Sequence, residues 1–326
     1  MTQTLESLRR RIDTAEDLYA VVRVMKALAA ASVRQYETAV ESLAEYNRTI
    51  EAGLQIILQN RPEAITAESP PSRHWKVIIF GSDQGMCGSF NEQVADFALE
   101  QLDNLAATQE DRTVLVVGSR AVGRMEDAGC GVGGRFSMPS SISGITSAVN
   151  DVLLEVEKLR FRKGIDQFLI VHHRPIAPAG SRPRKLQILP IDRAWLKTLA
   201  TRSWSSRSLP TFTMDWRRLF SALIRQHLFA TLYRAFAESL ASENASRLAS
   251  MHAAEKNIQS HLAQLSLDYH QGRQQSITEE LLDIIAGFET LTGEENLASG
   301  DAGGNHDQVA HPRQSRPERG AATDVC

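Results

Sequence analysis

The residues whose types and spacing could form a binding or catalytic site lie in a glycine-rich turn, residues 81–88 with the sequence GSDQGMCG. The turn follows an apolar run, which is where a nucleotide-binding turn would lie. However, it lacks the Gly-Lys-Ser/Thr ending that brings a lysine to a phosphate, and its glycines do not follow the G-x-G-x-x-G spacing. The next apolar run ends at Gly118 and Ser119, without an acid to hold a ribose hydroxyl. The turn is therefore predicted to be structural, and no cofactor is expected.

Two other groups of residues could carry chemistry but have simpler interpretations. His172 and His173 resemble a metal-binding pair, yet adjacent residues of a strand point to opposite faces of a sheet. Cys87 could act as a nucleophile, but nothing in the sequence places a base beside it, so a buried and inert thiol is favoured. We therefore predict no catalytic and no metal-binding residues in this chain.

The composition excludes several classes of protein. Charged residues make up 23% of the 326 residues and the net charge is -3, so nucleic acid is not expected as a partner. No run of about 18 apolar residues occurs, so no membrane-spanning helix is expected. The three cysteines are widely spaced without a C-x-x-C pair, and the N-terminus lacks an apolar signal core. These features favour a reducing, cytoplasmic compartment.

Two long helices are predicted to frame the turn and its neighbours. No proline or glycine interrupts the chain between Met1 and Ala52, and apolar or small residues recur there at alternating steps of four and three. This heptad seam predicts a coiled coil. A second helical pattern runs from Phe220 to Phe288, so we expect an antiparallel pair that projects as a rod. The seam positions are Leu8, Ile12, Ala15, Tyr19, Val22, Lys26, Ala29, Val33, Tyr36, Val40 and Leu43.

Between the long helices, apolar runs alternate with helical patterns. Strands are predicted at 75–80, 113–118, 167–172 and 185–189. Continuous apolar strands that alternate with helices are typical of a mostly parallel sheet covered on both faces. The predicted fold class is α/β, with a long antiparallel coiled coil of the N- and C-terminal helices and a central Rossmann-like domain.

The sequence is predicted to divide into six segments, two of which are linkers marked by proline or polar residues. The last segment is rich in glycine and polar residues, so we expect it to be disordered. The segments are a long helix at 1–58, a linker at 59–74, the α/β domain at 75–192, a linker at 193–217, a second long helix at 218–290 and a tail at 291–326.

Five motifs lie at the two ends of the chain and in the turn. They are RIDT at 11–14, VMKALAAA at 24–31, GSDQGMCGSFN at 81–91, SLASENASRLASM at 239–251 and GRQQSITEELLDIIAG at 272–287. They resemble motifs of the gamma subunit of F-type ATP synthases, occur in that family's order and together cover about residues 9 to 288. The run at 236–247 and the C-terminal extension suggest the alternate, sodium-linked N-type branch of these ATPases.

The resemblance implies a central rotor shaft without a catalytic site of its own. Such a shaft penetrates the hexamer of alpha and beta subunits, binds the epsilon subunit and stands on the membrane ring of c subunits. It would lie peripherally at the cytoplasmic face of the cell inner membrane. Its rotation couples ion flow to ATP synthesis or hydrolysis, because asymmetric contacts bias each catalytic subunit toward a different nucleotide affinity.

The resemblance also implies two groups of subunit contacts. A seam lysine and an exposed arginine suit an acidic partner electrostatically. The alternative is that Lys26 and Arg247 form surface ion pairs with acids such as Glu243, worth about 0–1 kcal/mol each. The matched positions are Arg273, Gln274 and Thr278 at a catch loop of the hexamer, and Met25, Lys26 and Arg247 at the acidic lever loop of beta.

A second hypothesis belongs to a different functional class. The chain could be a free-standing coiled-coil adaptor whose α/β head binds a peptide or a nucleotide. That hypothesis predicts independent folding and a ligand in the cleft beside residues 81–88. The rotor hypothesis instead predicts a chain that behaves well only with alpha and beta subunits present.

Overall fold

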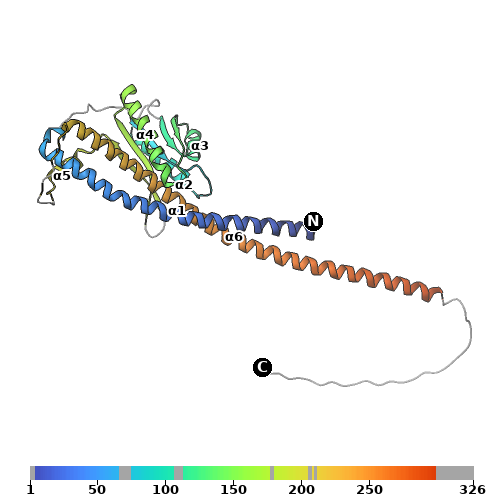
Figure 1. Ribbon diagram of the computed structural model, residues 1–326. Helices are drawn as coiled ribbons and strands as arrows, with labels where there is room; N and C mark the ends of the chain where they lie inside the picture. The colour runs from blue at the N-terminus through green and yellow to red at the C-terminus, as the bar shows by residue number, and fades with distance from the viewer. Residues whose placement is uncertain are drawn as a thin grey trace, which may run out of the picture. The chain divides into compact units, whose positions relative to one another are not determined.

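The computed structural model describes residues 4–65, 75–105, 113–176, 180–204, 208 and 211–298. Its five strands form one sheet of order β3-β2-β1-β4-β5 within residues 10–264 (Figure 1). Neighbouring strands are parallel except at the β4–β5 edge, where the pairing is antiparallel. The prediction of an α/β fold with a mostly parallel sheet is confirmed. The strands are β1 (Trp75–Phe80), β2 (Val114–Val117), β3 (Val132–Phe136), β4 (Gln167–Pro175) and β5 (Ser181–Leu189).

Helices cover both faces of the sheet, as the apolar strands require. On one face, α2 (Phe90–Asn104) and α3 (Ser119–Asp127) pack against alternate residues of β1, β2 and β4. On the other face, α4 (Ile142–Lys163) and α6 (Trp216–Ala298) pack against the remaining alternate residues. Every residue of β2 is therefore buried, which explains its uninterrupted apolar sequence.

The two long helices are α1 (Leu5–Asn60) and α6. The chain divides into two compact units, residues 10–264 and, from its two ends, 1–9 with 265–326. Within residues 10–264 the helices run antiparallel, because Tyr46 contacts Gln226 whereas Lys26 contacts Glu255. Of one series of predicted seam positions within this unit, Ala15, Ala29, Tyr36 and Leu43 are buried and Val22 is half-buried. The members of the other series are half-buried. The heptad pattern thus identified the packed face of α1.

Three features of the sequence were predicted wrongly. Strand β3 was missed because its sequence VGGRF has no apolar run and its side chains are not buried on either face. Residues 193–201 were assigned to a linker but form α5 (Arg193–Thr201), whose Leu196 and Leu199 are buried against the end of α1. The second long helix ends at Ala298 rather than at residue 290. The rest of the predicted tail, residues 299–326, lies outside the described residues.

Candidate functional site: the junction of the glycine-rich turn and the long C-terminal helix

The turn between β1 and α2 is built around three buried polar side chains. The backbone N–H of Ser82 donates to Oδ1 of Asn91 at 2.9 Å, and Nδ2 of Asn91 donates to Oγ of Ser82 at 2.8 Å. The Cys87 sulfur lies 3.6 Å from both of these side chains. Burial raises the pKa of the Cys87 thiol, which favours its neutral form. Cys87 is therefore a packed thiol, as predicted, rather than an activated nucleophile.

Asp83 connects the turn to two other segments at the carboxyl end of the sheet. Its Oδ1 accepts from the backbone N–H of Ser119 at 2.7 Å, and its Oδ2 accepts from that of Met138 at 2.7 Å. The first contact places a carboxylate at the N-terminus of α3, where the helix dipole favours negative charge. Gly118 precedes α3 with φ 98°, and a Cβ there would lie 2.7 Å from the backbone nitrogen of Ser82. Only glycine fits this close approach.

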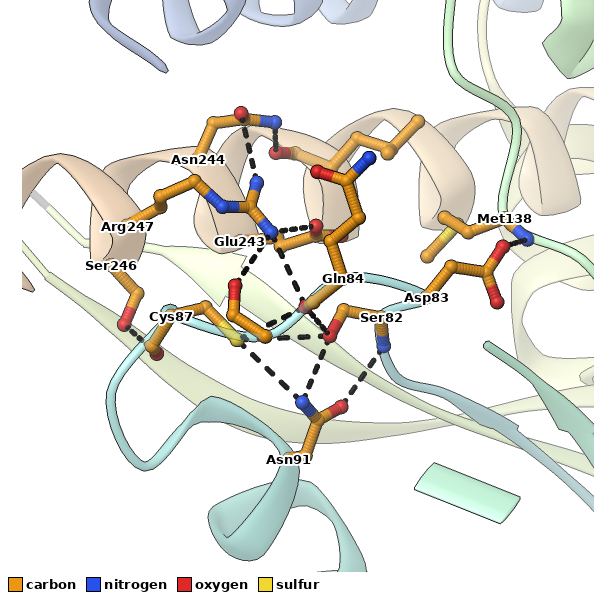
Figure 2. A network of polar contacts seen from close by, with 12 residues as sticks. Ser82, Asp83, Gln84, Cys87, Asn91, Met138, Glu243, Asn244, Ser246 and Arg247 are labelled. Carbon is orange, nitrogen blue, oxygen red and sulfur yellow. Dashed lines mark hydrogen bonds and ion pairs between the residues drawn. The ribbon is translucent and has the colours of Figure 1, made fainter. Parts of the chain in front are cut away.

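Side chains of α6 hold the carbonyl groups of the turn (Figure 2). Nη2 of Arg247 donates to the carbonyls of Gln84 and Gly85, each at 3.3 Å. Ser246 donates through Oγ to the carbonyl of Cys87 at 2.6 Å. Phosphate-binding turns offer N–H groups to an anion, whereas this turn offers carbonyl oxygens to a cation. The arrangement therefore fastens the α/β domain to the long helix.

The charge of Arg247 is balanced within α6. Its Nη2 lies 2.7 Å from Oε1 of Glu243, and both side chains are less than 10% exposed. Burial raises the pKa of Glu243, while the hydrogen bond and charge of Arg247 act in the opposite direction. Nη1 of Arg247 also donates to Oδ1 of Asn244 at 3.3 Å. The pair is thus mutually dependent, since removing either member leaves a buried group without its counter-charge.

A hollow of about 380 Å³ opens beside this pair. Met25 and Tyr36 of α1 line it together with Glu243 and Arg247 of α6. Burial, and next the charge of Glu243, raise the pKa of Tyr36, so its hydroxyl stays protonated. The structure therefore brings together two of the six predicted contact residues, Met25 and Arg247, at one place where α1, α6 and the turn meet.

Comparison with known sequences identifies the family of this chain. Relatives named ATP synthase gamma chain include those of Thermosynechococcus vestitus, 26% identical, and Synechococcus elongatus, 28% identical. The alignments cover 88% and 89% of this chain and 99% of each relative. A family model described as ATP synthase matches residues 4–291. The chain belongs to the ATP synthase gamma family.

Solved structures support the fold of this gamma-family chain. A chain of the Euglena gracilis mitochondrial ATP synthase, in a structure of OSCP, F1 and the c-ring, aligns with a TM-score of 0.63 and 16% identity. The alignment covers 94% of this chain and 99% of that one. A chain from the Tetrahymena thermophila central stalk and c-ring aligns with a TM-score of 0.51, over 72% of this chain. Among the described helices, none combines the length and apolar character of a membrane-spanning segment.

The predicted exposure of Arg247 is wrong for the gamma-family chain taken alone. Arg247 is only 7% exposed and its guanidinium points toward the turn. The alternative hypothesis named the correct partner, Glu243, but placed the pair on the surface, whereas it is buried. Lys26, in contrast, forms an ion pair with Glu255 of α6 and remains about one-third exposed. Whether either residue contacts another subunit stays a prediction.

The remaining predicted contacts lie in the other compact unit, on α6. Arg273, Gln274 and Thr278 are all exposed, and the Thr278 hydroxyl donates to the carbonyl of Gln274 at 2.8 Å. Beside them, a Cβ at Gly272 would lie 3.3 Å from Cδ2 of Leu5. The three side chains share a stretch of helix that is accessible to a partner.

The histidine pair has the geometry that the sequence predicted. Nε2 of His172 lies 3.0 Å from Oε2 of Glu238 on α6, whereas Nε2 of His173 lies 3.0 Å from the carbonyl of Phe90 on α2. The two imidazoles therefore occupy opposite faces of the sheet. In the part of the chain that the structure describes, no three His, Cys, Asp or Glu side chains are grouped to hold a metal ion.

Sequence reasoning missed the residues that complete the junction. Asp83, Asn91 and Ser246 each make a hydrogen bond that fixes the turn, and although all three lie in the matched motifs, none was predicted to hold the turn. A polar residue that directly follows an apolar strand or begins a helix was the available signal. The spacing of Glu243 and Arg247, four residues apart on a helix, was a clear sign of an ion pair.

Proposed function

We propose that this chain is the rotating central shaft of an F-type ATP synthase, without a catalytic site of its own. Its proposed partners are the alpha and beta subunits of the hexamer, the epsilon subunit and the membrane ring of c subunits. Membership of the gamma family and the printed titles of the aligned structures, which include a central stalk and c-rings, support this proposal. The chain would then be a peripheral part of a membrane-associated complex.

The observation that carries the proposal is the surface of the last described part of α6. Apolar side chains recur there along one stripe at steps of three and four, and each is 49–69% exposed. From Ile277 to Phe288 this stripe extends by about 17 Å along the helix, at about 1.5 Å per residue. An apolar stripe of this length needs a protein cover, and the proposed hexamer would supply one. The stripe consists of Ile277, Leu281, Ile284, Ile285 and Phe288.

The junction explains how such a shaft could transmit torque. Arg247 and Ser246 fasten the α/β domain directly to α6, so a force on that domain passes into the helix. The shaft is asymmetric because α1 and α6 have different sequences, and it would therefore touch each of three equivalent catalytic subunits differently. Differential contacts of this kind bias the open and closed states of each subunit.

The proposal is tested by expressing the chain with and without alpha and beta subunits encoded by the same genome. We expect the isolated chain to show no ATP hydrolysis, because the turn presents carbonyl oxygens and lacks a phosphate-binding lysine. With both partners, a complex that hydrolyses ATP should be isolated. Failure of the three subunits to associate would contradict the rotor proposal. If the isolated chain hydrolyses ATP and its Asp83→Ala variant does not, the adaptor alternative is favoured.

Replacing Arg273 and Gln274 together with alanine should lower assembly or ATP turnover of that complex by about tenfold. A charge-assisted hydrogen bond contributes about 1.5–3 kcal/mol, and about 1.4 kcal/mol corresponds to tenfold in affinity. Alanine has high helix propensity, so loss of helix is not the cause. The matched control is Lys256→Ala with Asn257→Ala, which removes a cation and an amide from exposed positions of the same helix. If the two double variants have equal effects, Arg273 and Gln274 do not form the proposed contact.

A further inference from the structure

A second hollow, of about 350 Å³, lies on the face of the sheet that α6 covers, away from the junction. It lies between β5, α5 and the two long helices, all within residues 10–264. Its volume is within the range of small-ligand sites in proteins, about 300–1,000 Å³. The polar side chains that line it include His172, Arg184, Arg234 and Glu238.

The two arginines are the unusual feature of this hollow. Arg184 of β5 pairs with His172 of β4 in the antiparallel register, so the two side chains share one face of the sheet. Arg234 approaches from α6, and its Nε is buried without a hydrogen-bond partner. Among the residues that the structure describes, neither arginine forms an ion pair. Two arginine side chains therefore line one hollow without an ion-pair partner among the described residues.

The acids around the hollow are already engaged. Glu51 pairs with Arg202 at 3.2 Å, and Glu238 lies 3.0 Å from Nε2 of His172. Asp192 accepts from the backbone N–H of Ala194 as the N-cap of α5. None of these carboxylates forms an ion pair with the two arginines, so both guanidinium groups remain available to a ligand in the hollow.

A third group points to a ligand. His172 is 2% exposed and lines the hollow, and its Nδ1 is buried without a hydrogen-bond partner. Buried polar atoms of this kind are rare in proteins and usually have a partner. Nε2 of His172 faces Glu238, so Nδ1 is the ring nitrogen that remains for a ligand in the hollow.

We propose that this hollow binds a phosphate group, either as inorganic phosphate or as part of a small phosphorylated molecule. Arg234 lies on α6, and Arg184 and His172 lie on the neighbouring strands β5 and β4. Guanidinium groups bind phosphate oxygens through paired N–H donors. The organic part of a ligand would lie against Trp195, which stacks on His227 with ring centroids 4.5 Å apart. This site does not depend on the rotor function.

The test is calorimetric titration of the full chain with inorganic phosphate, ADP and citrate. We expect saturable binding of phosphate or ADP, and tighter binding of ADP would identify the ligand as an organic phosphate. Arg184→Ala and Arg234→Ala should each weaken binding by about tenfold or more, as loss of a charge-assisted hydrogen bond does. The matched control is Arg182→Ala, an exposed arginine of the same strand that does not line the hollow, and it should bind normally.

A second measurement locates the ligand in the wild-type chain. In protein labelled with ¹⁵N-histidine, the ring nitrogens of His172 should shift during the titration. Those of His173, on the opposite face of the sheet, should not. Three results would each overturn the proposal. They are the absence of saturable binding, wild-type affinity of the Arg184→Ala variant, which loses an exposed side chain, and equal affinity for citrate and phosphate.

Discussion

Replacing Arg247 with alanine is expected to lower the free energy of unfolding of the full chain by about 3–5 kcal/mol. The guanidinium balances Glu243 in a buried pair and donates to the carbonyls of Gln84 and Gly85 through partly buried hydrogen bonds. Alanine leaves the Glu243 carboxylate buried without a counter-charge and both carbonyls without this donor. Urea unfolding at neutral pH, followed by circular dichroism, measures the difference.

Two further variants separate the buried pair from a general effect of losing an arginine. Arg225→Ala removes an exposed arginine of the same helix, 3.5 Å from Glu157, and should cost no more than about 1 kcal/mol. The double variant Glu243→Gln with Arg247→Met removes both charges and should be less destabilising than Arg247→Ala alone. If Arg247→Ala lowers the free energy of unfolding as little as Arg225→Ala does, the buried pair does not hold the turn on α6.

The same result bears on how the junction works in a rotor. The motif match predicts a contact between Arg247 and the beta subunit, whereas in the chain itself the donors of Arg247 face the turn. A variant that unfolds more readily and also turns over ATP slowly would assign Arg247 to the internal fastening. Lys26 offers a comparison, because its ion pair with Glu255 is more exposed and its loss should affect stability much less.

Sequence patterns predicted the elements of the fold wherever burial repeats regularly. The heptad series of α1 marked its packed face, and the apolar runs marked β1, β2 and β4, because a strand buried on both faces leaves no place for polar residues. Strand β3 escaped because its two glycines and exposed side chains carry no such pattern. Helix α5 escaped because two buried leucines in nine residues are too short a signal.

The candidate site shows where sequence reasoning stops. Glu243 lies one helical turn from Arg247, so their pairing is visible in the spacing. The carbonyls of Gln84 and Gly85 belong to a turn more than 160 residues away, and only the packing of α6 on the sheet brings them within reach. The inward direction of Arg247 therefore depended on tertiary structure, and a charged residue on a long helix was wrongly expected at the surface.

His173 should make the stability of the chain depend on pH below neutrality. The side chain is fully buried, stacks on Phe90 with ring centroids 4.1 Å apart and lies 3.0 Å from the Phe90 carbonyl. Burial is the main cause that lowers its pKa from 6.5 to about 4, and the nearby His172 adds to it, while the hydrogen bond to Phe90 opposes it. The unfolded chain therefore binds a proton between these two values that the folded chain excludes.

Because the unfolded state binds more protons in that window, the contribution of His173 is fully present above pH 6.5 and is lost as the pH falls to about 4. The loss amounts to about 3 kcal/mol, since one pKa unit corresponds to about 1.4 kcal/mol. Urea unfolding at a series of pH values should show a shallower slope for His173→Gln, whose amide can still donate to the Phe90 carbonyl. The control His261→Gln, at an exposed position, should keep the wild-type slope. Identical slopes for the wild type and His173→Gln would mean that this imidazole takes up its proton without unfolding the chain.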